Sequence, residues 1–216
     1  MLFDVSRGDL ADIFGEGRLV ALPATAFPPS AAGTRGARLL QTVGVPSGTL
    51  WLREPDEESG RLPLVQDVVG SEDFENFEDA PEGAGTWPVI GWLLNAHLAL
   101  GPGSGKVYAV DADEETVQEL HTDVSSLVHV TLRFQRLLEE FTFGSGDGDG
   151  SSGSSSDEEA DFERLEREVE RIRQETSSVD PLPFLHDETV WWVVGEEIAA
   201  GQRFTGDSPG ARSLYG

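Results

Sequence analysis

Few residues of this chain stand at spacings that could carry out chemistry. The four histidines form neither an HExxH pattern nor a pair four residues apart, and no serine stands in a GxSxG elbow. His97 and His121 both fall in a predicted antiparallel meander, so they could approach each other across strands. The alternative is that each is an ordinary packed or surface histidine. The chain has no cysteine, which excludes disulfides, thiol nucleophiles and thiolate metal sites.

Two glycine-rich runs have some features of ligand-binding loops. Residues 101–106 end in the Gly-Lys pair of a phosphate-binding loop, but a Walker loop needs glycine where this chain has Leu100, and serine or threonine at Val107. Residues 147–158 place acids at the first, third and twelfth positions of a calcium loop, but Ser152 stands where glycine is required. The first run joins two predicted strands, and the second is typical of a flexible spacer. The sequence therefore predicts no cofactor and no metal site.

The acidic residues are too numerous to define a catalytic pair. With 40 Asp and Glu residues in 216, some carboxylates will always lie at the separation that glycosidases use, so such a pair carries no information. No motif supports an enzyme. We therefore expect a protein that binds another protein without catalysing a reaction.

The charge balance indicates what kind of partner that would be. The 40 acids oppose 15 bases, and the formal net charge is −25. Such a surface repels the phosphates of nucleic acid and of anionic membranes, which argues against both as partners. It attracts a basic protein and steers its approach. The alternative is that the acids serve solubility alone.

The densest acidic stretch is residues 54–82, which contain eleven acids and a single base, Arg61. We expect an acidic loop over residues 71–85, which begins inside this stretch and in which Phe74 and Phe77 could be apolar anchors. Such a loop could contact a basic partner, or it could be solvated and disordered. The predicted partner-binding residues of the loop are Glu72, Asp73, Phe74, Glu75, Phe77, Glu78 and Asp79.

Two tryptophans complete the predicted partner-binding set. Trp191 and Trp192 are adjacent in a predicted helix, so their side chains point about 100° apart and at most one can lie squarely in the core. The other could face a partner, and Trp192 is the predicted partner-binding residue of the two. Trp92, in the first strand of the meander, could be a core residue or a rim residue.

Periodicity and turn residues predict the elements that would position these side chains. Predicted helices cover residues 6–14, 34–43, 123–141, 157–174 and 188–200. Predicted strands cover residues 18–22, 49–52 and 62–69, and an antiparallel meander covers 89–94, 97–100, 106–110 and 117–121.

These elements predict one folded core with an appendage. We expect a core over residues 1–143, a flexible Gly/Ser/Asp linker over 144–156, C-terminal helices over 157–204 that pack on the core, and a disordered tail over 205–216. The first residues lack the pattern of a signal peptide, and no window reaches 18 consecutive apolar residues. We therefore expect a cytoplasmic protein.

The meander and its surroundings resemble a known family. Val89-Ile90-Gly91 is followed by residues 98–111, LALGPGSGKVYAVD, and then by a helix with aliphatic and aromatic spacing. Residues 28–46 and the closing stretch around Trp191-Trp192 are similar to other parts of the same family. Together they resemble the SUKH superfamily, and within it the fourth clade, of bacterial immunity proteins. Gly101 stands where that clade usually has Asp, and residues 144–174 resemble an insertion.

The resemblance implies both a fold and a role. The implied fold is α+β, with a mixed, largely antiparallel sheet of about six strands and helices packed mainly on one face. The implied role is to neutralise a toxin by direct binding, often a nuclease or a nucleic-acid deaminase. The alternative within the superfamily is a regulatory scaffold that has no toxin partner.

Overall fold

The structure, a computed structural model, describes residues 1–46, 48, 50–77, 79–143 and 155–204. Most of the predicted linker, the calcium-loop positions 147–154 and the predicted tail lie outside the described residues. The α+β class is confirmed, because helices and antiparallel sheets are both present and all described strand pairs are antiparallel.

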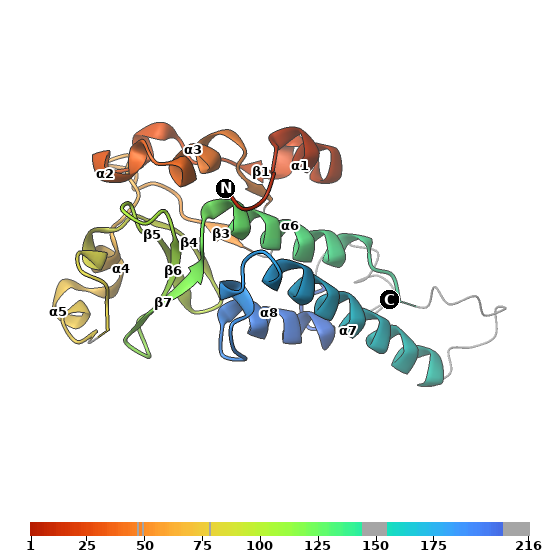
Figure 1. Ribbon diagram of the computed structural model, residues 1–216. Helices are drawn as coiled ribbons and strands as arrows, with labels where there is room; N and C mark the ends of the chain where they lie inside the picture. Colours follow the sequence, from red (N-terminus) through yellow and green to blue (C-terminus); the bar gives the residue numbers. More distant parts are fainter. Residues whose placement is uncertain (47, 49, 78, 144–154, 205–216) are drawn as a thin grey trace.

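A five-stranded sheet forms the centre of the molecule (Figure 1). Its order is β3-β4-β5-β6-β7, so that every strand pairs with the next one along the chain. The bounds are β3 (Trp51–Leu52), β4 (Val89–Leu93), β5 (Ala96–Leu100), β6 (Val107–Asp111) and β7 (Thr116–His121). The predicted meander is therefore confirmed. A separate pair, β1 (Leu19–Val20) with β2 (Val45–Pro46), forms a second small sheet.

Edge strand β3 can approach β4 because residue 91 is a glycine. A Cβ atom at Gly91 would lie 2.5 Å from the backbone oxygen of Trp51, a distance that real Cβ atoms do not adopt. The close approach fixes the register in which Trp51 pairs with Trp92, and Arg53 N–H donates to the Ile90 carbonyl one step further on.

The main core lies between one face of this sheet and the long helix α6 (Val124–Glu140). The Asp123 side chain caps α6 by accepting from the Ser126 backbone N–H, and Leu127 and Phe134 are completely buried. Helices on both sides of α6 complete this layer (Figure 1). They are α1 (Arg7–Phe14), α2 (Pro29–Ala32) and α3 (Arg35–Thr42) on the N-terminal side, and α7 (Ser155–Ser177) and α8 (Val190–Ala199) on the C-terminal side.

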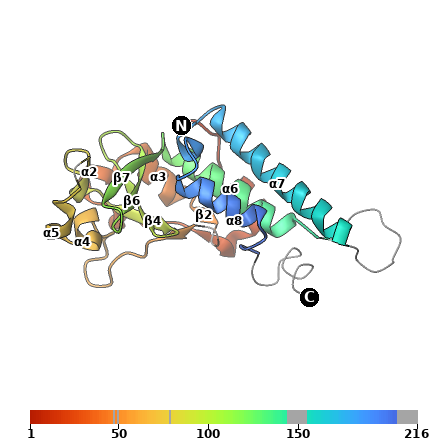
Figure 2. The same cartoon turned by 90° about the horizontal axis from the view of Figure 1, so that it is seen from below.

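The other face of the sheet carries a smaller apolar cluster. Helices α4 (Val65–Val69) and α5 (Ser71–Phe74) lie on the side of the sheet away from α7 and α8 in both views (Figures 1 and 2). The predicted strand over residues 62–69 is therefore wrong. The Asp67 carboxylate accepts from the Leu64 backbone N–H and so stabilises the first turn of a helix, and only Leu64 forms a β-bridge, with Pro88.

The remaining differences concern short segments and a helix cap. Short 3-10 turns are formed by Glu16–Arg18, Ala24–Ala26, Ala84–Thr86 and Leu182–Phe184. The closing helix α8 begins after Thr189, whose hydroxyl donates to the Pro183 and His186 carbonyls, and so it starts two residues later than the predicted start at residue 188.

Candidate partner-binding surface

Residues 54–82, which we call the acidic segment, connect β3 to the turn before β4 and include α4 and α5. Val65 and Phe77 hold the segment on the sheet, where they pack with Val89, Ala99 and Val110. The predicted loop over residues 71–85 is thus partly helical and has its own apolar anchorage.

Phe77 is only 6% exposed, and its ring lies 4.9 Å from the half-buried ring of Phe74. Both rings pack in or against the smaller cluster, so in this structure they anchor the segment to its own sheet and are not presented to a partner. The hypothesis that they anchor a partner is therefore dropped. The sequence could not decide this point, because an aromatic ring beside exposed acids suits either role.

The predicted acidic residues of this segment are exposed. Glu72, Asp73, Glu75 and Asp79 all face solvent, whereas Glu78 lies outside the described residues. In the parts of the segment that the structure describes, no carboxylate forms an ion pair. Eleven acids against one base give the segment a formal charge of −10, which no cation of the described chain neutralises by direct contact.

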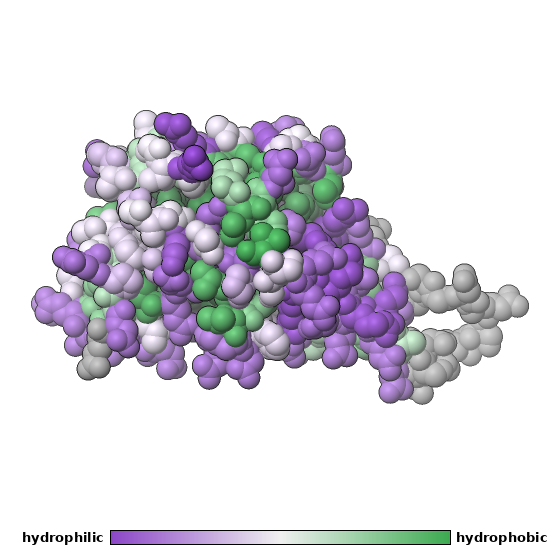
Figure 3. Space-filling model, viewed as in Figure 1, coloured by the Kyte–Doolittle hydropathy of each residue, from purple (hydrophilic) through white to green (hydrophobic). Residues whose placement is uncertain are grey.

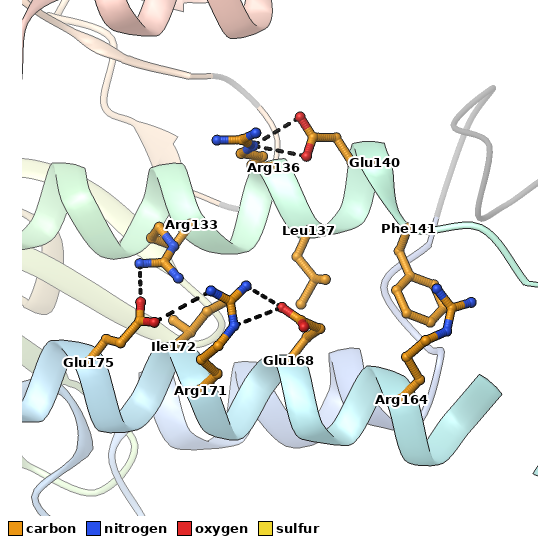
Figure 4. Close-up of a pocket in the computed structure, with 10 residues that line it drawn as sticks. All are labelled: Arg133, Arg136, Leu137, Glu140, Phe141, Arg164, Glu168, Arg171, Ile172 and Glu175. Atoms are coloured by element: carbon orange, nitrogen blue, oxygen red, sulfur yellow. Dashed lines mark hydrogen bonds and ion pairs between the residues drawn. The ribbon is translucent and has the colours of Figure 1, made fainter. Parts of the chain in front are cut away.

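Most acids of α6 and α7 differ, because they are paired with arginines. A groove of about 590 Å³ lies between these two helices, and its charged side chains pair with one another (Figure 4). Arg133 lies 2.6 Å from Glu175, and Arg171 pairs with both Glu175 and Glu168. The hydrogen bond from Arg133 lowers the pKa of Glu175, so this carboxylate stays ionised. Figure 3 shows the dense cover of hydrophilic side chains over α7.

The side chains of the groove hold α6 and α7 together. Arg136 pairs with Glu140 one turn further along α6, and the guanidinium of Arg164 lies 4.2 Å from the centre of the Phe141 ring. The charged side chains of the groove are thus engaged within the protein.

The two C-terminal tryptophans divide as the sequence predicts. Trp191 is completely buried, and Trp192 is half-buried. The guanidinium of Arg173 lies 4.0 Å from the centre of the Trp192 ring, and it also donates to the Trp192 carbonyl and to Glu196. Intramolecular contacts therefore already cover one face of Trp192, which makes it a weaker partner anchor than an exposed ring.

Trp92 lies on the sheet next to a residue that sequence reasoning did not select. Its ring stacks against that of Trp51, with centroids 6.3 Å apart and planes 9° from parallel, and Trp51 is 57% exposed. The guanidinium of Arg53 lies 5.9 Å from the Trp92 ring centre. Each of two predicted strands contains one of these tryptophans. The strands pair across 41 positions of the chain, and no pattern of neighbouring residues indicates that pairing.

His97 and His121 do not come together. His97 pairs with Val110 on the face that carries the acidic segment, whereas His121 lies on the other face, against α6 and α8. Among the described residues, no group of three or more His, Asp or Glu side chains could hold a metal ion.

Buried His121 joins three elements of the main core. The Trp191 indole N–H donates to His121 Nε2 at 2.7 Å, so that Nε2 carries no proton and Nδ1–H donates to the Ser126 hydroxyl at 2.9 Å. Burial lowers the pKa of His121 to about 3, against the opposing pull of the Asp180 carboxylate. Asp180 in turn accepts from the backbone and hydroxyl of Thr122.

The glycine-rich run at 101–106 is a turn between β5 and β6, as the sequence predicts. Gly101 N–H donates to the Lys106 carbonyl, and the Lys106 ammonium pairs with Glu119 on β7 at 2.6 Å. Its lysine is thus engaged by a carboxylate, and no helix begins at the turn to receive a phosphate.

The fold and this surface describe an α+β protein with one strongly acidic, unpaired face, and comparison with known families agrees. The model of the SUKH-4 immunity protein family matches residues 5–197. The match spans most of the chain, so the chain belongs to the SUKH-4 immunity protein family, and the resemblance seen in the sequence is confirmed. No curated protein and no solved structure matches the chain. None of the helices within the described ranges is long and apolar enough to cross a membrane.

Proposed function

We propose that this protein is a non-catalytic immunity protein of the cytoplasm that binds a basic, nucleic-acid-targeting toxin and neutralises it by direct contact. The observation that carries the proposal is the acidic segment, whose described carboxylates are exposed and have no cationic partner in the described chain. Membership of an immunity protein family supports the same role.

The acidic segment suits a partner that itself binds nucleic acid. A toxin that acts on DNA or RNA presents arginines and lysines where the phosphates must lie. Unpaired carboxylates can occupy those positions with charge-assisted hydrogen bonds, and their field speeds the encounter. Most acids of α7 are already paired with arginines, whereas the described acids of the acidic segment are not, so the acidic segment would exert the stronger attraction of the two.

We expect a toxin gene beside the gene of this chain, and binding kinetics with the toxin domain that it encodes test the proposal. The test variant replaces Glu72, Asp73, Glu75 and Asp79 together by Gln or Asn, which removes charge and keeps shape. We expect the association rate to fall about tenfold or more at low salt, with a shallower dependence on salt. The wild-type protein should also protect cells that express the active toxin.

A matched variant controls for net charge. It replaces Glu159, Glu163, Glu166 and Glu170 of α7 by Gln, so that it removes the same number of exposed charges from another surface. We expect it to bind at nearly the wild-type rate. Unchanged kinetics in the acidic-segment variant would remove this segment from the interface. Weak binding of the wild-type protein to many cellular proteins, and none to the toxin, would favour a regulatory scaffold.

A further inference from the structure

A row of cross-strand neighbours crosses the sheet on the face that carries the acidic segment. The residues of the row, in order from β3 to β7, are Trp51, Trp92, His97, Val110 and Val117. Val110 also belongs to the small cluster beneath α4 and Phe77. The acidic segment therefore covers the β6–β7 end of the row, and the β3 end is left open.

The open end of the row is aromatic. Trp51 is 57% exposed, and it is the one aromatic residue among the exposed large apolar side chains of the described ranges. It lies nearly parallel to Trp92, which is itself only half-buried. A stacked pair of indoles at the edge of a sheet is a large, rigid apolar surface, and such surfaces are typical anchors of protein interfaces.

The structure also shows what chemistry the face of this pair accepts. The guanidinium of Arg53 lies 5.9 Å from the Trp92 ring centre, within the range of a cation–π contact. Within the described residues, Arg53 forms no ion pair with a carboxylate. Trp51, whose ring no cation of the described chain contacts, offers the same kind of aromatic face to a guanidinium of a partner.

Acidic residues follow the row at both of its ends. β3 leads through Arg53 directly into the acidic segment at Glu54. At the other end, β6 and β7 are joined by a turn that carries exposed Asp113 and Glu114. An aromatic surface whose strand continues into the acidic segment is complementary to a positively charged partner surface that presents an arginine.

We propose that Trp51 and Trp92 form a docking platform on which an arginine side chain of a basic protein partner stacks. The platform continues the surface of the acidic segment, so this inference rests on the proposed function and names the contact that would hold the complex. The carboxylates of the acidic segment act on the rate of encounter. The platform acts on the rate of dissociation, because its contacts form only when the two surfaces have met and expelled water.

Substitutions at Trp51 test the platform by surface plasmon resonance against the toxin domain expected under the proposed function, inactivated in its own active site. We expect Trp51→Ala to weaken the Kd at least about thirtyfold, chiefly through faster dissociation. Trp51→Phe retains an aromatic face and should stay within about fivefold of the wild-type protein. Trp51→Leu keeps apolar area without a π system, and it should lose nearly as much as Trp51→Ala.

Two controls separate binding from folding. Leu185, which is 61% exposed and far from the row in the sequence, provides a matched deletion of exposed apolar area, and Leu185→Ala should bind as the wild-type protein does. A thermal melt of each Trp51 variant should match that of the wild-type protein, because an exposed side chain contributes little to folding.

The binding results distinguish the proposed function from the proposed platform. Wild-type protein that does not bind the toxin domain overturns the proposed function. Wild-type binding that Trp51→Ala changes by less than threefold overturns the platform and leaves the proposed function intact. Trp51→Leu with wild-type affinity overturns the stacked arginine, because apolar area alone would then be sufficient.

Discussion

Lowering the pH from 7 to 5 should weaken the fold through His121. This side chain is completely buried, and its neutral form is held by the Trp191 indole N–H on one nitrogen and by Ser126 on the other. Protonation of Nε2 would make it a donor that faces the Trp191 indole N–H, which is also a donor. It would also place a positive charge in the core. Burial accordingly lowers the pKa of His121 to about 3, against about 6.5 for a histidine in an unfolded chain.

The sign and size of the effect follow from linkage. The folded-state pKa lies below the unfolded-state pKa, so the unfolded chain takes up the proton first and stability falls as the pH drops below about 6.5. The loss approaches about 1.4 kcal/mol per pH unit and levels off near the folded-state pKa of about 3. Between pH 7 and pH 5 it amounts to about 2 kcal/mol, a value that depends almost entirely on the unfolded-state pKa.

Urea unfolding at the two pH values, with His121→Gln as the comparison, isolates this contribution from that of the many carboxylates. Gln can accept from the Trp191 indole through its amide oxygen but does not titrate. We expect His121→Gln to be less stable than the wild-type protein at pH 7, and the difference to shrink by about 2 kcal/mol at pH 5. His186→Gln, at an exposed histidine, should follow the wild-type protein at both values. An identical loss in the wild-type protein and His121→Gln would refute the argument.

Two further predictions concern the edge strand and the unpaired acids. Gly91→Ala should cost about 1–3 kcal/mol in a thermal melt and weaken toxin binding, because the new Cβ would lie 2.5 Å from the Trp51 carbonyl oxygen and push β3 away. Gly103→Ala, where a Cβ meets nothing within 4 Å, should change neither, and equal effects of the two substitutions would contradict the proposed contact. Raising the ionic strength from about 10 mM to about 150 mM should increase the melting temperature by about 2–4 °C, because salt screens the repulsion among the exposed acids. A melting temperature that does not depend on salt would show that this repulsion is negligible.

The parts of the fold that depend on local chemistry were predictable. Ser6 and Asp123 cap their helices through side chains that stand directly before apolar-periodic residues, and short turns separate the strands of the meander. The division of Trp191 and Trp192 between core and periphery also follows from helix geometry alone.

The parts that depend on distant contacts were not predictable. Residues 62–69 form a short apolar run that suits a strand or a helix equally well, and a single carboxylate, that of Asp67, stabilises the helical form. Phe77 became a core residue because a second face of the sheet was available to cover it. The stack of Trp51 on Trp92 requires edge strand β3 to approach β4 closely, which Gly91 permits. No pattern of neighbouring residues predicts this approach.

The two separate apolar clusters have a consequence for how this protein can change. The acidic segment is anchored in the small cluster on one face of the sheet, whereas α6, α7 and α8 are held by the large cluster on the other. Substitutions in clusters that share no side chain contribute nearly independently to stability. The stability change caused by a substitution on the outer face is therefore nearly independent of the contacts in the large cluster. The residues that would contact a partner can therefore change while the side chains of the large cluster stay the same.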